Sequence, residues 1–274
     1  MKKSTLALLA ASLLTLTLLV GCGGEPAKAT TDKTAPIKIG VTAGPHAEIL
    51  EQVKALAAKQ NLKIEVVEFT DFVTPNVALF QEELFANSMQ HRPYLNATNK
   101  KDPKFDLVDC FKTVTFPMAG YSQKIKKGEA LPDGATVAIP NDPSNGGRAL
   151  LLLAQQGLIT VKDPKNVTTA VADITANPHN YKFEELDAAT VPRSLADVDF
   201  AVINANYALN AKLNPVQDSL FIESPESPYV CIFVTKDKNK NDPRIAQLKK
   251  IYQSPEIEKY VADHFQGSVI IGWK

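Results

Sequence analysis

One arginine in the middle of the chain has the chemistry to bind a small anion. Arg148 follows Asn145, Gly146 and Gly147 and precedes the apolar run 150–153. If Asn145 caps a helix here, Arg148 lies in its first turn, where a cation opposes the helix dipole unless an anion docks at the same end. The two glycines would let a ligand approach the backbone, and a guanidinium grips a carboxylate through two parallel hydrogen bonds. The alternative is a surface arginine that is tolerated at small cost.

Two further polar residues stand at the ends of predicted elements. Asn204 follows the apolar run 200–203, and its amide offers donors and acceptors to a carboxylate or an ammonium. The alternative is a turn residue that bonds its own backbone. His91 begins a helical stretch and is either a ligand contact or a capping or packing residue.

An enzyme is the rival class, because catalysis needs a nucleophile beside a positioned base. Cys110, Cys231 and the four histidines leave this formally open. No nucleophile elbow, acid pair or metal-ligand spacing supports it, so we expect no catalytic residue, cofactor or metal. The two cysteines are over 100 residues apart, and a disulfide between them is not favoured.

The elements that would position these residues predict an α/β protein. Short β-branched runs bounded by turn residues predict strands at 37–41, 64–69, 136–140 and 200–203. Helices are predicted from Pro45, from Asn145 to Gly157, from Pro243 and from Ser254. Two strand–helix units precede Cys110 and two follow Gly134, so we expect two lobes that offer strand ends to a shared cleft. The segment 229–234 would be a return strand between the lobes.

The first residues predict export and a lipid anchor. Lys2 and Lys3 precede an uncharged apolar run at 6–20, which is too short to span a bilayer and is typical of a secretory signal. Leu19-Val20-Gly21-Cys22 resembles the lipobox of bacterial lipoproteins, whose cysteine carries a diacylglycerol. We therefore predict a signal peptide at 1–21, lipidation of Cys22 and a flexible tether at 22–36. Without its two signal lysines the chain has 28 basic and 30 acidic side chains, a net charge of −2, which argues against nucleic-acid binding.

Signature stretches spread over the mature chain resemble the methionine-binding lipoproteins of the MetQ/NlpA family. They include Val-Thr-Ala-Gly-Pro-His-Ala-Glu at 41–48, Glu-Phe-Thr-Asp at 68–71, Gln90-His91, Pro-Tyr-Leu at 93–95, Ala-Gly-Tyr-Ser at 119–122, Ala-Ile-Pro-Asn-Asp-Pro at 138–143, Gly-Arg-Ala-Leu at 147–150, Ala-Val-Ile-Asn at 201–204 and Glu-Ser-Pro-Tyr-Val at 226–230. The resemblance implies a two-lobed periplasmic-binding-protein type 2 fold with a ligand cleft between the lobes. It also implies delivery of L-methionine to an ABC importer permease. We expect a monomer anchored to the membrane by the lipid on Cys22, facing the extracytoplasmic side, with lobe 1 at 37–116 and 228–274 and lobe 2 at 117–227.

By this resemblance Arg148 holds the ligand carboxylate, Asn204 helps to fix the head group, and His91 helps to enclose the thioether side chain. Three apolar positions complete the enclosure: Phe72, Met89 and Phe116. These three depart from the family, which usually has Tyr, Phe and Tyr there. At Cys231 the family commonly has an asparagine that touches the head group, and a thiol is a poor substitute for an amide. Such a lost bond costs about 1–3 kcal/mol if a polar group stays unpaired. Another apolar amino acid, a short peptide, or an adhesive surface role therefore remain alternatives.

Overall fold

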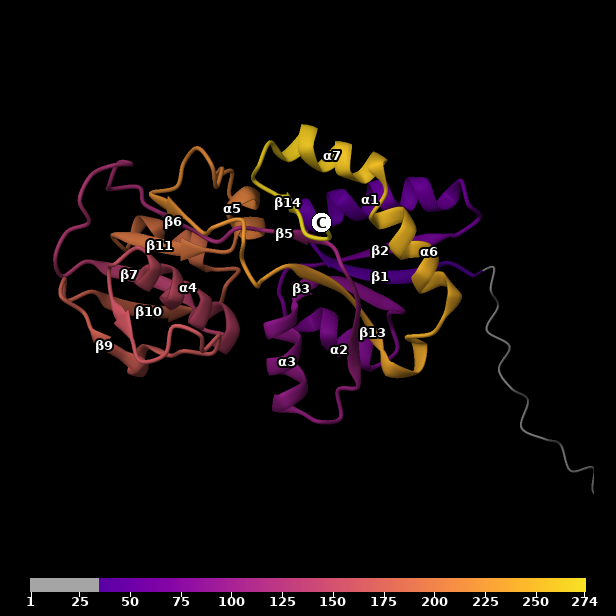
Figure 1. Ribbon diagram of the computed structural model, residues 1–274, viewed down its shortest axis with the longest axis horizontal. Coiled ribbons are helices and arrows are strands. Elements are labelled where there is room, and N and C mark those ends of the chain that lie inside the picture. Colours follow the sequence, from indigo (N-terminus) through magenta and orange to yellow (C-terminus); the bar gives the residue numbers. More distant parts are fainter. Residues whose placement is uncertain (1–34) are drawn as a thin grey trace, which may run out of the picture. The chain divides into compact units, whose positions relative to one another are not determined.

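The computed structural model describes residues 35–274, so the predicted signal peptide, Cys22 and nearly all of the tether lie outside the described residues. These described residues form one compact unit. Two five-stranded sheets organise this unit, each packed with helices (Figure 1). The result is a two-lobed α/β fold, as the sequence predicted.

The first sheet has the strand order β2-β1-β3-β13-β4. Its strands are β1 (Ile37–Thr42), β2 (Ile64–Phe69), β3 (Ala86–His91), β4 (Leu107–Lys112) and β13 (Cys231–Lys236). The first three are parallel, and β13 runs antiparallel between β3 and β4. We call this sheet lobe 1, together with its helices α1 (Pro45–Ala58), α2 (Thr74–Phe80), α3 (Arg92–Lys101), α6 (Pro243–Tyr252) and α7 (Pro255–Phe265).

The second sheet has the strand order β10-β7-β11-β6-β12 and forms lobe 2. Its strands are β6 (Ala119–Tyr121), β7 (Thr136–Pro140), β10 (Lys182–Leu186), β11 (Phe200–Ile203) and β12 (Phe221–Ile222). Its helices are α4 (Pro143–Gln155), α5 (Ala205–Asn210) and a 3₁₀ helix (Val191–Ala196). Two small ladders stand apart from the large sheets: β5 (Val114–Thr115) with β14 (Ile270–Ile271), and β8 (Thr160–Val161) with β9 (Ile174–Ala176).

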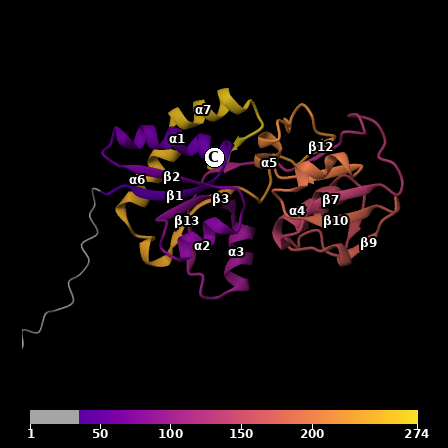
Figure 2. The same cartoon turned by 180° about the vertical axis from the view of Figure 1, so that it is seen from behind.

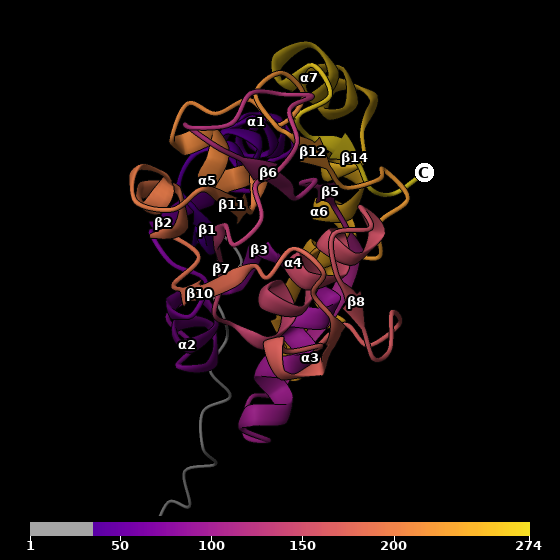
Figure 3. The ribbon, with the colours of Figure 1, turned by 90° about the vertical axis from the view of Figure 1, so that its left-hand side faces the viewer.

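The chain crosses between the lobes twice. The first crossing, 116–118, follows β5 and precedes β6, and the second, 223–230, follows β12 and precedes β13. Figure 2 shows the two sheets from behind, with α5 next to lobe 1, and Figure 3 shows α3 beside α4. The lobe boundaries given above stay a prediction.

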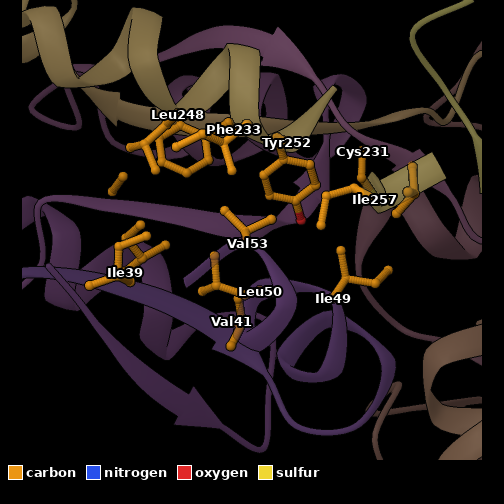
Figure 4. Close-up of a cluster of buried hydrophobic side chains, with 14 of the residues drawn as sticks. Ile39, Val41, Ile49, Leu50, Val53, Cys231, Phe233, Leu248, Tyr252 and Ile257 are labelled. Carbon is orange, nitrogen blue, oxygen red and sulfur yellow. The ribbon is translucent and has the colours of Figure 1, made fainter. Parts of the chain in front are cut away.

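Strand alternation divides the core of lobe 1 between the two faces of its sheet. Ile39, Val41 and Phe233 pack with α1, α6 and α7 in one buried cluster (Figure 4). Their neighbours Ile232 and Val234 face the other way, into a cluster with side chains of α2 and α3. Successive side chains of a strand point to opposite faces, so both faces of this sheet are apolar and each is covered by helices.

The structure confirms most predicted elements but changes the start of the helix that carries Arg148. Strands and helices lie where β-branched runs, Pro45, Pro243 and Ser254 predicted them. The N-cap of α4, however, is Asp142 and not Asn145. The Asp142 carboxylate accepts the backbone N–H of Ser144 at 3.2 Å and of Asn145 at 2.9 Å. Since Pro143 takes the first helical position, Arg148 lies in the second turn, and the dipole argument for an anion there was wrong.

Strand β3 was not predicted from the sequence because four of its six residues are polar, although all six are buried. Its side chains pair with one another and with α2 and α6. The amides of Asn87 and Gln90 donate to Asn76 Oδ1 at 2.9 and 2.6 Å, and Ser88 lies 3.1 Å from the hydroxyl of Tyr252. Buried polar groups are tolerated when they are satisfied in this way, so hydrophobicity alone does not find this strand.

The glycines before Arg148 serve packing and do not open the backbone to a ligand. A Cβ on Gly146 would lie 2.7 Å from the carbonyl oxygen of Pro140, and one on Gly147 would lie 2.7 Å from that of Val167. Both neighbours are backbone atoms that cannot turn away. The glycines therefore allow α4 to pack closely against β7 and the loop that follows β8.

We predict that Gly147→Ala destabilises the protein by about 1–3 kcal/mol, because the overpacking exceeds the gain of about 1 kcal/mol that alanine normally brings to a helix. Urea denaturation would measure the change. Gln155→Ala, at the exposed end of the same helix, is the matched control and should stay within about 0.5 kcal/mol of the parent protein. A gain of stability in Gly147→Ala would contradict this prediction and would show that the loop at Val167 moves to accommodate the methyl group.

Candidate functional site

The seven residues that the sequence assigned to ligand binding border one cavity. They are Arg148, Asn204, His91, Phe72, Met89, Phe116 and Cys231. Five further residues border it: His46, Gln90, Tyr94, Asn145 and Asn206. The cavity measures about 20 Å³, which is room for about one water molecule. Several of its residues follow or end the parallel strands β1, β2, β3 and β11, where open α/β sheets bind ligands.

Arg148 is buried and forms an ion pair with Glu223, a residue that the sequence analysis did not single out. The two side chains are 3% and 7% exposed. Arg148 Nε donates to Glu223 Oε1 at 3.0 Å, and Nη2 donates to Glu223 Oε2 and to the carbonyl oxygen of Phe116 at 2.9 Å. The guanidinium also lies over the ring of Tyr229, 4.5 Å from its centroid. Arg148 is therefore no surface arginine.

These contacts place Arg148 at the junction of the lobes. Phe116 and Glu223 belong to the first and second chain crossings, and Glu223 also accepts the backbone N–H of Met118 at 3.2 Å. One guanidinium on α4 thus ties both crossings to lobe 2. Its Nε–Nη2 edge is taken by Glu223, so the two-bond grip on a ligand carboxylate cannot use that edge. Within residues 35–274, Nη1 has no hydrogen bond to a protein atom and is the part of the guanidinium left for a ligand.

A hydrogen-bonded chain joins the two lobes across the cavity. The backbone N–H of Tyr94 donates to His91 Nδ1 at 3.2 Å, so the neutral imidazole carries its proton on Nε2. That proton is donated to Asn145 Oδ1 at 3.1 Å, and Asn204 Nδ2 donates to the same oxygen at 2.8 Å. Asn145 Nδ2 is bound in turn by Asp142 Oδ2 at 2.8 Å. His91 therefore caps α3 and also connects lobe 1 to lobe 2.

Both histidines of the cavity are neutral at physiological pH. Burial, with the nearby Arg148 cation as a second cause, lowers the pKa of His91 to about 3. Burial lowers the pKa of His46 to about 3 as well. Neutral imidazoles can line an apolar pocket without the desolvation cost of a charge.

Rings and sulfur atoms make the rest of the wall. The ring of Phe72 lies 4.8 Å from that of Tyr207 on α5 and 5.9 Å from that of Tyr94 on α3, and the ring of Phe116 lies 4.2 Å from that of His46. Cys231 faces His91 in the β3–β13 ladder, and burial raises the pKa of its thiol to about 12. The wall is thus aromatic, sulfur-rich and uncharged.

The residues that sequence reasoning missed gave only weak signals. Glu223 is an isolated acid after a two-residue strand, and only the need of a buried arginine for a counter-ion could have led to it. His46 stood in a signature stretch with no role attached. Asn145 was assigned as a helix cap, although its side chain in fact binds three polar residues.

Cys110 and Cys231 are free thiols. No group of three or more His, Cys, Asp or Glu side chains in residues 35–274 is arranged to hold a metal ion. Among the helices of the same residues, none is long and apolar enough to cross a membrane.

Fold and cavity together define a two-lobed binding protein of the periplasmic type, with its site between the lobes. A family model described as NlpA lipoprotein matches residues 37–273, and the chain belongs to that family. A relative from Vibrio cholerae, described as a probable D-methionine-binding lipoprotein MetQ, is 43% identical over 257 residues, which is 93% of each chain.

Solved structures agree with this assignment. A nutrient binding protein from Burkholderia cenocepacia bound to methionine is 44% identical, with a TM-score of 0.83 over 86% of this chain and 99% of that one. An ABC transporter periplasmic substrate-binding protein from Coxiella burnetii is 39% identical, with a TM-score of 0.82 over 86% of this chain and all of that one.

We predict that Glu223→Ala costs about 3–5 kcal/mol of stability, because it leaves the Arg148 cation buried and unpaired. Chemical denaturation would measure the loss. Glu65→Ala is the matched control: Glu65 pairs with Lys38 at 3.7 Å, both side chains are 52% exposed, and such a pair is worth less than about 1 kcal/mol. Equal losses in the two variants would contradict a structural role for the buried pair.

Stability should also fall as the pH drops below 6.5. The unfolded chain protonates His46 and His91 near their ordinary pKa of 6.5, whereas the folded protein keeps them neutral down to about 3. The unfolded state therefore binds more protons in this window, and each histidine removes up to about 1.4 kcal/mol per pH unit. Denaturation from pH 7 to pH 5 in His91→Gln should show a slope smaller by about one proton. Gln217→Ala, at an exposed residue of lobe 2 that carries no proton-binding group, should leave the slope unchanged.

Proposed function

We propose that this chain is the substrate-binding lipoprotein of an ABC uptake system, and that it captures an amino acid, with methionine as the first candidate, between its lobes. Membership of the NlpA lipoprotein family supports the class. The names of its relatives, a D-methionine-binding lipoprotein and an ABC transporter substrate-binding protein, support the ligand and the transporter. The methionine-bound structure at 44% identity points the same way.

The observation that carries this proposal is a buried guanidinium beside an apolar, uncharged cavity. Arg148 Nη1 would donate to the ligand carboxylate, while Glu223 holds the other edge of the guanidinium in place. Asn204 Oδ1 is buried and has no partner among residues 35–274, so it is free to accept from an α-ammonium. A preorganised, desolvated donor of this kind contributes more than the same group does in water.

The opposite wall suits an apolar side chain that contains sulfur. Phe72, Met89 and Phe116 offer soft apolar surface, and His91 and Cys231 are uncharged there. A thioether gains about 0.3–1.5 kcal/mol from each good contact with an aromatic ring. A charged ligand side chain would lose its hydration without compensation.

Binding would involve movement of the lobes or of the wall, because the cavity as it stands has room for about one water molecule. Interlobe hydrogen bonds favour the closed arrangement. Besides the His91–Asn145 bond, the Tyr207 hydroxyl donates to the carbonyl oxygen of Thr70 at 3.3 Å. A ligand that touches both lobes shifts the population toward closure by its differential affinity.

We assign no catalytic activity to the chain. Burial raises the pKa of the Cys110 thiol to about 11 and that of Cys231 to about 12, so neither forms the thiolate that a nucleophile requires. His91 is engaged at both ring nitrogens and holds no nucleophile. A lipid on Cys22 would anchor the protein to the extracytoplasmic face of the membrane, beside its permease. We expect the anchored protein to be a monomer.

We predict that Arg148→Lys weakens L-methionine binding about 10- to 100-fold, since one charged hydrogen bond contributes about 1.5–3 kcal/mol. Lysine keeps a cation for Glu223 but lacks Nη1, so the free energy of unfolding should fall by less than the free energy of binding. Titration calorimetry of the mature lipoprotein with L-methionine would measure the effect, and Arg193→Lys at an exposed site of lobe 2 is the control. Unchanged affinity in Arg148→Lys would defeat the carboxylate assignment.

The same titrations decide between methionine and the alternatives. Both enantiomers of methionine, leucine, phenylalanine and a methionine-containing dipeptide form the panel. A preference for leucine, phenylalanine or the dipeptide would rule out methionine as the main ligand but would leave the assignment as a substrate-binding lipoprotein intact. An absence of binding and of thermal stabilisation by every member would favour a surface lipoprotein that kept the fold for adhesion.

A further inference from the structure

Two buried amide atoms at the cavity have no hydrogen-bond partner among the described residues. One is Asn204 Oδ1, an acceptor, and the other is Asn206 Nδ2, a donor. Asn204 is 5% exposed and Asn206 is 2% exposed, and both border the cavity. Buried polar groups are paired in the great majority of cases, so two unpaired ones at the same cavity require an explanation.

The two atoms are complementary in what they offer. Asn204 ends β11, and Asn206 lies two residues further on, in α5. The rest of the Asn204 amide is committed, because Nδ2 donates to Asn145 Oδ1 at 2.8 Å. One acceptor and one donor on the same short segment of lobe 2 match the two ends of an amino-acid head group, an ammonium that donates and a carboxylate that accepts.

We propose that Asn206 is a second carboxylate-binding residue, which donates from Nδ2 to one ligand oxygen while Arg148 Nη1 donates to the other and Asn204 Oδ1 accepts from the ammonium. This inference rests on the proposed function and deepens it. The ligand class follows from charge, because the Arg148–Glu223 pair is neutral overall and the cavity histidines are uncharged. The site accepts a net-neutral zwitterion and disfavours amino acids whose ammonium or carboxylate is masked.

The test uses Asn206→Leu and Asn206→Asp in the mature lipoprotein. Leucine removes the donor at similar volume, and aspartate replaces it with an anion. Titration calorimetry should show L-methionine binding about 10- to 100-fold weaker in Asn206→Leu, and weaker still in Asn206→Asp, where the carboxylates repel. L-Methioninol, whose carboxylate is replaced by a hydroxymethyl group, should lose less than about 3-fold between the parent protein and Asn206→Leu.

A stability readout separates binding from folding. Because Asn206 Nδ2 makes no bond to the described protein, Asn206→Leu should keep or raise the melting temperature without ligand while affinity falls. A structural residue would lower both. Asn96→Leu, at an exposed position of α3, is the control and should change neither.

Several outcomes would overturn the inference while leaving the proposed function intact. They are parent-like methionine affinity in Asn206→Leu, equal losses for methionine and methioninol, or an Asn206→Asp affinity equal to or above that of Asn206→Leu. The last comparison decides the matter even if methioninol binds too weakly to titrate. If the parent protein binds no amino acid at all, the proposed function fails first.

Discussion

The buried ion pair between Arg148 and Glu223 is the constraint on which the site depends. Removing two charges from water costs several kcal/mol per ion, and only good geometry with further hydrogen bonds repays that cost. Here the further bonds come from both chain crossings, through the carbonyl oxygen of Phe116 and the backbone N–H of Met118. Helix α4 must therefore hold Arg148 at one position relative to the chain crossings, and the second crossing must place Glu223 in contact with it. Lobe movements that keep this ion pair intact avoid the cost of a buried, unpaired charge.

A neutral cavity follows from that pair. The guanidinium is balanced before any ligand arrives, and the imidazoles of His46 and His91 carry no charge at physiological pH. Free carboxylic acids without an ammonium therefore gain little from the cation, because Glu223 has already neutralised it. On the proposed function, recognition would pass to single hydrogen bonds, and the unpaired Asn204 Oδ1 would matter alongside the arginine. The amide of Asn145 serves instead to hold His91 and Asn204 in place. Selectivity of this kind is directional, since each bond fixes one atom of the ligand.

Much of this fold and part of the site follow from local sequence signals. Apolar runs and helix starts at Pro45, Pro243 and Ser254 predicted elements whose periodicity or capping chemistry is local. The family resemblance brought together seven residues that in fact border one cavity. Long-range pairing is what stayed hidden: the buried polar side chains of β3 find their partners in Asn76 and Tyr252. Glu223 was missed for the same reason, since no local sequence pattern indicates that it pairs with Arg148, 75 residues away.

Cys231 stands where the family resemblance led us to expect an asparagine. Its side chain lies in the buried cluster with Tyr252 and Ile257 (Figure 4), and its thiol is protonated. An asparagine at that position would need partners for four hydrogen bonds at the edge of an apolar core, whereas a thiol needs none. On the proposed function, the wall contributed by lobe 1 would offer no amide to the ligand head group at this position. Polar recognition then falls to lobe 2, and lobe 1 supplies mainly apolar surface. Each lobe alone would hold only half of an amino acid, so the full binding energy is realised only when the lobes close on it.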